Sequence, residues 1–188
     1  MERTRLPPGQ VEARRLVVYA ALGRPEVDVG SWRLDVKGLV ERPLSLSYQE
    51  LLKMRCVKVK GGFHCVEGWS IMTVEWEGVR IRDLAEMVKP APKARWLMFR
   101  SVEGYSAPVP VEDALSDDSI IALRVNGKPL SREHGFPARP IIPSLYAWKS
   151  VKWLKEMEFI EKYVDGYWEE RGYHERGNVW LEERRKKR

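Results

Sequence analysis

The chain has 188 residues and a formal net charge of +6, with 44% hydrophobic and 32% charged residues. This balance excludes a disordered chain, and the length favours a single domain with one core. The sequence contains neither a signal-peptide pattern nor an apolar run long enough to cross a bilayer, so we expect a cytoplasmic protein without a membrane partner. Only two cysteines are present, which excludes a disulfide scaffold and a four-cysteine zinc site.

The positive charge is concentrated at the two ends of the chain. The first fifteen residues hold four basic and two acidic side chains, and the last seven hold five basic and two acidic. Basic ends of this kind are typical of frayed, solubilising tails, so we expect no nucleic-acid partner. Asparagine and glutamine occur only twice each beside abundant lysine, arginine and glutamate, a bias typical of thermophile proteins.

Apolar alternation predicts strands, and capping or proline signals predict short helices. In the first half of the chain we expect a strand at 32–40, a helix at 48–54 capped by Ser47 and Glu50, a strand at 55–60 that runs on to residue 65, a turn at Gly78 and a helix at 83–88. In the second half we expect a buried strand at 95–101, a helical turn at 111–115, a strand at 119–125, a hairpin turn at Asn126-Gly127 and a strand at 151–159. Prolines at 137, 140 and 143 exclude regular structure there. Short strands with few helices predict an α+β fold with mixed β-sheets.

Two long loops, at 61–70 and 131–150, are the places where we expect function. The first holds Cys65 in the stretch FHCVEGWS, and this cysteine is a small buried hydrophobe, a nucleophile or a soft-metal ligand. Cys56 lies within a predicted strand, where we interpret it as structural. We expect no disulfide between the two cysteines in a cytoplasmic protein.

The second loop combines polar donors with prolines and aromatic residues in HGFPARPIIPSLYAWKSVKW. Its donors are His134, Arg139, Lys149, Ser150 and Lys152. Arginine offers a planar fork for phosphate, so the stretch is interpreted either as a phosphate-bearing cofactor site or as a solvated basic loop. Rigid prolines favour a preformed site.

A tyrosine stands after the glycine that ends the predicted buried strand, in SVEGYSAPVP. Tyr105 is either a surface aromatic residue that fills a turn or a neutral hydrogen-bond donor to a substrate oxygen.

Taken in order and spacing, FHCVEGWS, SVEGYSAPVP, NGKPLSREHGFPARPIIP and YAWKSVKW resemble the molybdopterin-binding domain of the sulfite oxidase family. The resemblance extends to WRLDVKGLVERPLSL and GYWEERGYHERG, and it is strongest to short stand-alone prokaryotic members. It divides the chain into an N-terminal arm at 1–29, a molybdopterin-binding oxidoreductase domain at 30–180 and a basic C-terminal tail at 181–188.

The resemblance implies a mixed α+β fold and a Mo-molybdopterin cofactor. It makes Cys65 the protein ligand of molybdenum and places Tyr105 opposite the oxygen ligand of the metal. An N-terminal contact from Arg14 or Arg15 is also implied. The residues implied to contact the pterin and its phosphate are Ser101, His134, Arg139, Ser150 and Lys152, with backbone groups of Val151.

The residues after the cysteine guide the expected substrate. Animal-type sulfite oxidases carry an arginine-bearing segment there, whereas this chain has Glu67 followed by Gly68 and Trp69. A carboxylate near the metal repels anionic sulfite, and CVE before Trp-Ser is similar to bacterial methionine sulfoxide reductases. We therefore expect oxygen-atom transfer, with reduction of a sulfoxide or N-oxide favoured and Glu67 serving either as a proton relay or as an ordinary loop carboxylate.

Two alternatives stay open at this point. One is sulfite oxidation with Arg100 or an N-terminal arginine binding the anion, and the other is a molybdopterin-binding protein without turnover. The resemblance covers no haem domain and no second domain, so a separate protein or small carrier is expected to exchange electrons with the site.

Overall fold

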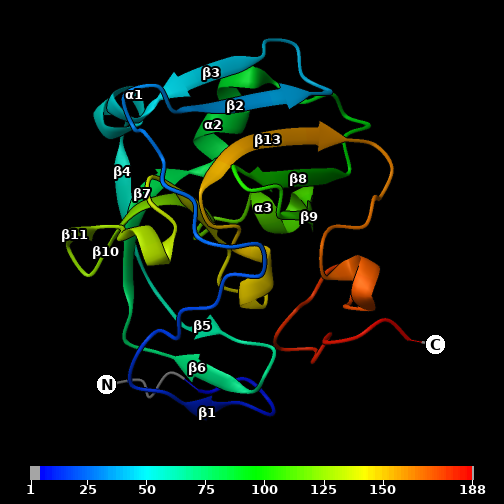
Figure 1. Cartoon of the computed structure of the whole chain (residues 1–188). Helices are drawn as coiled ribbons and strands as arrows, with labels where there is room; N and C mark the ends of the chain where they lie inside the picture. Colours follow the sequence, from blue (N-terminus) through cyan, green and yellow to red (C-terminus); the bar gives the residue numbers. More distant parts are fainter. Residues whose placement is uncertain (1–4, 188) are drawn as a thin grey trace.

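The computed structural model describes residues 5–187, and these residues form three β-sheets with short helices around them (Figure 1). The largest sheet has five strands in the order β3 (Leu44–Ser47), β2 (Arg33–Gly38), β13 (Leu154–Ile160), β8 (Trp96–Ser101) and β9 (Ser106–Pro110). The second sheet has the order β11 (Lys128–Pro129), β10 (Ile120–Val125), β7 (Glu75–Arg80) and β4 (Cys56–Lys60), with β12 (Arg139–Ile141) also paired to β10. The third has the order β1 (Val11–Glu12), β6 (Trp69–Ile71) and β5 (Phe63–His64).

The five-stranded sheet confirms the mixed pairing that the sequence predicts. Strand β2 runs parallel to β13, whereas β8 runs antiparallel to both β13 and β9. The apolar residues of these strands face a core shared with helix α2 (Ile81–Val88), which buries four side chains at helical spacing. The same apolar periodicity is visible in the sequence, so the buried face of α2 follows from the residue pattern.

Helix α1 (Tyr48–Lys53) confirms the predicted capping box. The backbone N–H of Glu50 donates to the Ser47 side chain, and the Glu50 carboxylate accepts from the Ser47 N–H at 2.8 Å. The described residues also form a short α-helix, α3 (Val111–Ala114), and the 3-10 turns η1 (Arg132–His134), η2 (Ala147–Lys149) and η3 (Glu169–Arg171). No helix within the described residues has both the length and the apolar character needed to cross a bilayer.

The second sheet corrects two predictions. Gly78 lies inside β7 and not in a turn. A Cβ at this position would stand 1.9 Å from the carbonyl oxygen of Ile121 on β10, so the strand pairing requires glycine here. The glycine permits a close backbone approach between paired strands. Pro140 lies in the short strand β12, opposite Ile121, although prolines at this spacing predict irregular structure. A proline fits an edge strand because its missing N–H can face away from the ladder.

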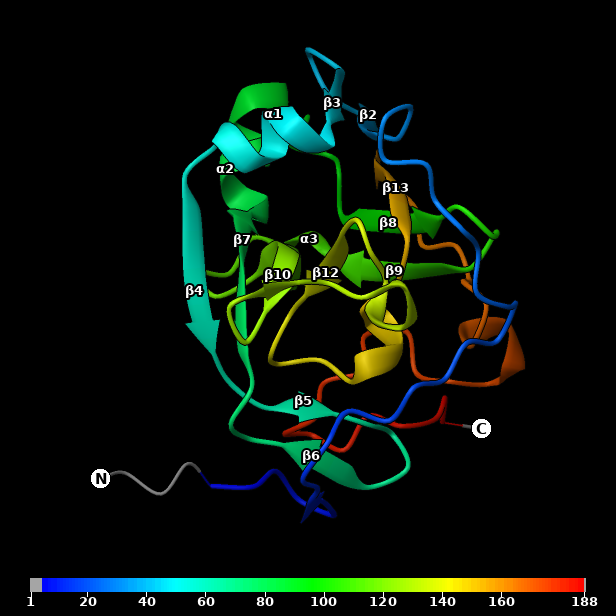
Figure 2. The ribbon, with the colours of Figure 1, turned by 60° about the vertical axis from the view of Figure 1, so that its left-hand side comes forward.

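The third sheet joins segments that are far apart in the sequence. Strands β5 and β6 form a hairpin within the predicted loop at 61–70, and β1 pairs with β6 in parallel. The small sheet lies at the opposite end of the molecule from β2 and β3, and the C-terminal segment passes close to it (Figures 1 and 2). The N-terminal arm is thus part of the folded domain.

Candidate active site

A cavity of about 410 Å³ lies between the β5–β6 hairpin, the N-terminal arm and the segment that follows η1. Its walls come from five stretches of the chain, at 16–21, 63–69, 103–105, 134–153 and 168–173. Aromatic side chains are prominent in the lining, namely Tyr19, Phe63, Trp69, Tyr105, Trp148, Trp153, Trp168 and Tyr173. Flat apolar walls of this kind suit a planar ring system.

Cys65 stands in the turn between β5 and β6, and its side chain lines the cavity. The turn is closed by the Cys65 N–H, which donates to the carbonyl of Trp69 at 2.8 Å, and by the Gly68 N–H, which donates to the carbonyl of Cys65 at 3.1 Å. Gly68 has a φ of +98°, a conformation that favours glycine. Burial raises the pKa of the Cys65 thiol. A bound metal ion reverses this effect, because it stabilises the thiolate.

Both cysteines are free thiols, as expected. Cys56 lies on β4, half-buried against the main core and away from the cavity. No group of three or more His, Cys, Asp or Glu side chains in residues 5–187 is arranged to hold a metal ion. Cys65 therefore offers a single thiolate to whatever group enters the cavity.

Glu67 follows Cys65 by two residues and lines the cavity, but its side chain is exposed to solvent. A proton relay at Glu67 is expected to depend on burial of its carboxyl, and the exposed side chain does not provide that burial. The less exposed carboxyl of the cavity is instead that of Glu103, on the turn after β8, which is half-buried and has a buried Oε2 atom. Burial raises the pKa of Glu103, and its Oε2 atom has no hydrogen-bond partner among the described residues. Sequence reasoning missed this residue, although it stands in the SVEGY stretch.

Arg139 also lines the cavity and is 3% exposed. Its Nε donates to the Ser150 hydroxyl at 2.9 Å, its Nη2 to the Ser150 carbonyl at 3.0 Å and its Nη1 to the His134 carbonyl at 3.0 Å. The guanidinium lies over the rings of Phe63 and Trp76, 5.1 and 5.5 Å from their centroids. Burial lowers the pKa of Arg139 to about 9, and no carboxylate pairs with it among the described residues.

Two further basic side chains, Lys152 and His134, adjoin Arg139. The ammonium of Lys152 donates to the carbonyls of Tyr19 and Glu133, and burial together with the charge of Arg139 lowers the pKa of Lys152 to about 8. Burial and the same charge lower the pKa of His134. We call His134, Arg139 and Lys152 the cation cluster. Burial lowers the pKa of all three groups, and the charge of Arg139 lowers the pKa of the other two further, so together they form a site for an anion.

Two predicted contact residues do not reach the cavity wall. Ser101 is fully buried, and its hydroxyl donates to the carbonyl of Tyr105 at 3.0 Å. Val151 is fully buried in the main core, and its N–H donates to the carbonyl of Lys149 at 3.1 Å. Tyr105 does line the cavity, but its hydroxyl donates to the carbonyl of Trp148 at 2.6 Å. Burial raises the pKa of Tyr105 well above its usual value, so this phenol stays neutral.

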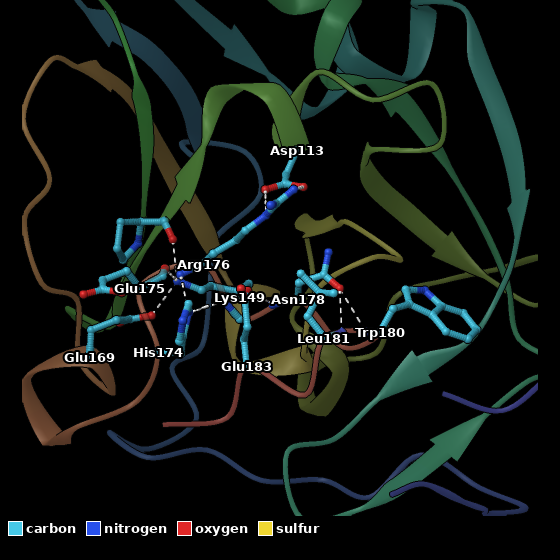
Figure 3. Close-up of polar contacts among 12 residues, drawn as sticks. Asp113, Lys149, Glu169, His174, Glu175, Arg176, Asn178, Trp180, Leu181 and Glu183 are labelled. Carbon is cyan, nitrogen blue, oxygen red and sulfur yellow. Dashed lines mark hydrogen bonds and ion pairs between the residues drawn. The ribbon is translucent and has the colours of Figure 1, made fainter. Parts of the chain in front are cut away.

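Lys149 and Arg100 are also held elsewhere. Lys149 is 1% exposed and lies outside the cavity lining. Its ammonium donates to the carboxylate of Glu169 at 2.7 Å (Figure 3). Arg100 lies on β8 and donates to Glu156 and Glu158 of the neighbouring strand at 2.5 Å each. The predicted anion-binding role of Arg100 is therefore wrong, because paired carboxylates neutralise it on the face of the sheet.

The N-terminal arm supplies a wall that the sequence does not reveal. Residues 16–21 line the cavity, whereas Arg14 and Arg15 are exposed and lie outside the lining. The polar contact from the arm to the cation cluster is made by a backbone group, the Tyr19 carbonyl, which accepts from Lys152. Backbone contacts carry no residue signature, which is why the arginines attract attention in the sequence and the arm itself does not.

Polar contacts hold the C-terminal segment, from the half-buried pair of Arg176 and Asp113 to exposed local bonds around Asn178 (Figure 3). The guanidinium of Arg176 donates to both oxygens of Asp113, at 2.8 and 2.9 Å, and the Asn178 side chain accepts from the N–H groups of Trp180 and Leu181. The basic end continues this pattern, since Lys186 pairs with Asp165 at 2.7 Å. Over residues 181–187 the structure thus corrects the expectation of a frayed tail.

Most of the stretch that forms the cavity matches a known family. Residues 21–168 match the model of the oxidoreductase molybdopterin-binding domain. This chain belongs to that family. It is also 38% identical over 96% of its length to the uncharacterised oxidoreductase YuiH of Bacillus subtilis, and it covers 91% of that protein. The expected class, a molybdopterin-dependent oxidoreductase related to sulfite oxidase, is confirmed.

Other relatives carry more specific names. Protein-methionine-sulfoxide reductase catalytic subunits of Campylobacter jejuni and Xanthomonas campestris are 29% and 31% identical over 74% and 73% of this chain. The chain covers 52% and 47% of these two proteins, so it spans about half the length of these relatives. The sulfane dehydrogenase SoxCD of Paracoccus pantotrophus matches 80% of the chain with a TM-score of 0.70 at 23% identity, covering 42% of that chain. This likeness confirms the expected molybdopterin-binding fold.

Proposed function

We propose that the cavity binds Mo-molybdopterin, with Cys65 as the protein ligand of the metal, and that the chain reduces a neutral sulfoxide or N-oxide. One combination of observations carries the proposal: a free cysteine and a cation cluster, centred on the buried Arg139 and without a carboxylate partner among the described residues, line the same cavity. A soft metal is suited to the thiolate, and a phosphate is suited to the cations.

The lining matches the cofactor at each of its parts. Aromatic walls accommodate a pterin ring, and Glu103 offers a carboxyl oxygen that no described residue uses. Arg139 gives three of its five N–H groups to protein acceptors, so it keeps donors for a phosphate. The cavity volume of about 410 Å³ lies within the range of small-molecule and cofactor sites.

The charge distribution favours a neutral substrate. Within the described lining, positive charge comes only from the cation cluster, and a phosphate that occupies the cluster neutralises it. Glu67 adds negative charge beside Cys65, and the guanidinium of Arg184, which reaches this turn, donates to the Val66 and Gly9 carbonyls. Sulfite carries two negative charges and would lack a partner there, whereas a sulfoxide needs none.

When bound, the cofactor supplies the two-electron chemistry of oxygen-atom transfer. The protein orients the reacting groups and excludes water with its aromatic walls. Tyr105 holds η2 in place through its bond to the Trp148 carbonyl, which keeps Trp148 and Ser150 on the cavity wall. Reduction of an oxide consumes two protons, and the half-buried Glu103 carboxyl, whose pKa burial raises, is suited to hold one of them.

A separate electron donor belongs to the same proposal. The reductase relatives are named as catalytic subunits, and a relative in Azospira oryzae is named as a subunit of a putative reductase of this kind. Those names describe multi-component systems. We infer that this chain also receives its electrons from another protein or a small carrier.

The test is elemental and kinetic. Protein produced with sufficient molybdenum and pterin should contain about one molybdenum per chain, and Cys65→Ser should lower sulfoxide turnover by roughly a hundredfold or more. Cys56→Ser is the matched control, because this cysteine lies outside the cavity. Zinc or no metal in the wild-type protein contradicts the cofactor assignment, and faster turnover of sulfite than of sulfoxides or N-oxides contradicts the substrate class.

A further inference from the structure

Arg184 belongs to the basic C-terminal segment, yet its side chain reaches the turn that carries Cys65. Its Nη1 donates to the carbonyl of Val66, and its Nη2 donates to the carbonyl of Gly9 at 3.1 Å. The guanidinium also lies over the ring of Tyr146, 5.4 Å from the centroid. One side chain near the end of the chain thus joins the residue after Cys65 to the N-terminal arm.

The backbone of the arm is shaped for this contact. Gly9 has a φ of +64°, and a Cβ at this position would stand 2.7 Å from Nη2 of Arg184. A Cβ on Gly68 would stand 3.2 Å from the carbonyl oxygen of Gly9. Glycine at both positions allows the arm, the turn and the guanidinium to approach one another closely.

Other bonds from the arm hold the same turn. The Gln10 side chain donates to the carbonyl of Cys65 at 3.1 Å and accepts from the Ser70 hydroxyl at 3.0 Å. Ser70 in turn accepts from Nδ1 of His64 at 2.7 Å, since its own proton goes to Gln10. The Val11 N–H donates to the carbonyl of Gly68 at 2.9 Å. The Cys65 turn is thus held from the N-terminal side by several bonds and from the C-terminal side by Arg184.

The backbone around Arg184 is itself held by neighbouring segments. The His174 N–H donates to its carbonyl at 3.3 Å, and its neighbour Arg185 bridges to Tyr173. The guanidinium suits its task because two N–H groups in one rigid plane can serve two carbonyls at once, whereas the single ammonium of lysine lacks this fork.

We propose that Arg184 is a positioning residue for the metal ligand, and that it fixes the Cys65 turn by binding the Val66 and Gly9 carbonyls together. The proposal rests on the proposed function in that it takes Cys65 as the ligand of molybdenum. Groups that orient a metal ligand without touching the metal change affinity or activity by roughly 10- to 100-fold when they are removed.

The experiment compares Arg184→Gln, Arg184→Lys and Lys187→Gln in the full chain. Lys187→Gln removes one positive charge from the same segment at an exposed position, so it controls for charge. Hydrogen exchange is followed in peptides that cover residues 8–12 and 63–71, with and without the cofactor. Arg184→Gln should speed exchange there by roughly five- to tenfold, Arg184→Lys by less, and Lys187→Gln should match the wild type.

The loaded proteins then give two further readouts. Arg184→Gln should lower kcat by roughly 10- to 100-fold with little change in KM, and it should shift the paramagnetic resonance spectrum of the bound molybdenum. Unchanged exchange in Arg184→Gln overturns the inference, and so does faster exchange with an unchanged spectrum. A wild-type chain that binds no molybdenum contradicts the proposed function instead, because exchange in the cofactor-free protein still measures the hold of Arg184 on the turn.

Discussion

Two parts of the cavity lining, the cation cluster and the Cys65 turn, are built in different ways. The cation cluster comes from one stretch of chain, since Arg139 binds the His134 carbonyl and Ser150 within eleven residues of itself. The Cys65 turn is held by groups from both ends of the chain, with Gln10 on one side and Arg184 on the other. A site built locally is visible in a sequence, whereas a site built from distant segments is visible only after folding.

The Cys65 turn and the cation cluster also differ in the free energy that each costs in the cofactor-free protein. Backbone and side-chain hydrogen bonds satisfy the Cys65 turn in the protein alone. The cation cluster holds buried positive charge without a carboxylate, and burying such charge costs free energy until an anion binds. The turn is therefore preformed, and the cluster depends on its ligand.

The largest expected effect comes from Arg139→Met, which removes the centre of the cluster. Cofactor retention should fall by roughly 10- to 100-fold, because the phosphate loses its forked donor. The free energy of unfolding of the cofactor-free protein should stay within about 1 kcal/mol of the wild type, since relief of charge burial offsets the lost hydrogen bonds. Cofactor content and urea unfolding measure the two effects.

The exposed Arg95→Met is the matched control for this change. A cofactor-free Arg139→Met protein that is several kcal/mol less stable than the wild type would show that Arg139 supports the fold by itself. The contrast between a ligand-dependent cluster and a preformed turn would then be lost.

A pH effect of intermediate size is expected from Lys152. Its pKa is about 8 in the folded protein, below the ordinary 10.5, so the folded state releases this proton at lower pH than the unfolded state. Stability of the cofactor-free protein should therefore rise with pH, and below about pH 8 the full penalty applies. The wild type should gain about 1 kcal/mol over Lys152→Met between about pH 7.5 and 9.5 in urea unfolding.

Added inorganic phosphate should reduce this gain, because an anion in the cluster raises the pKa of Lys152 again. The difference between the wild type and Lys152→Met cancels the other groups that titrate over the same range. A difference that is flat or falls with pH is the result that would refute the anion-site interpretation of Lys152.

The smallest effect is expected at the preformed Cys65 turn, from Glu67→Gln. The side chain is exposed, so solvent screens its charge. Sulfite use at low salt should rise by roughly two- to fivefold, while sulfoxide turnover should stay within about twofold of the wild type. Steady-state rates at two salt concentrations measure both, with the exposed Glu26→Gln as control. Equal sulfite rates in both variants would remove Glu67 from substrate selection.

Local sequence patterns predicted the elements whose stability is local. Helix α1 begins where Ser47 and Glu50 form the capping box, and the turn at Asn126-Gly127 lies between β10 and β11 with a positive φ at both residues. Alternation identified β2, β4, β8 and β10 to within about two residues. Strand β13 begins later than predicted, at Leu154, because Trp153 adopts a φ of +50°.

Elements that depend on a distant partner escaped prediction. Gly78 marks a turn in most contexts, but here it lets β7 approach the carbonyl of Ile121. Strand β1 has only two residues, and its pairing with β6 gives it an extended form. Glu103 shows the same limit in the site, because its lack of a partner is a property of the folded cavity.

The sequence by itself determined the family, the mixed α+β class and the residues whose chemistry is unusual, Cys65, Arg139 and Lys152 above all. These follow from motif spacing and residue type, which are read without coordinates. Only the tertiary structure decided which of the predicted residues share a cavity, and it brought in the N-terminal arm, Glu103 and Arg184. The physical reason is that burial and a missing partner arise from packing between distant segments, and these two properties set the charge and the pKa of each group.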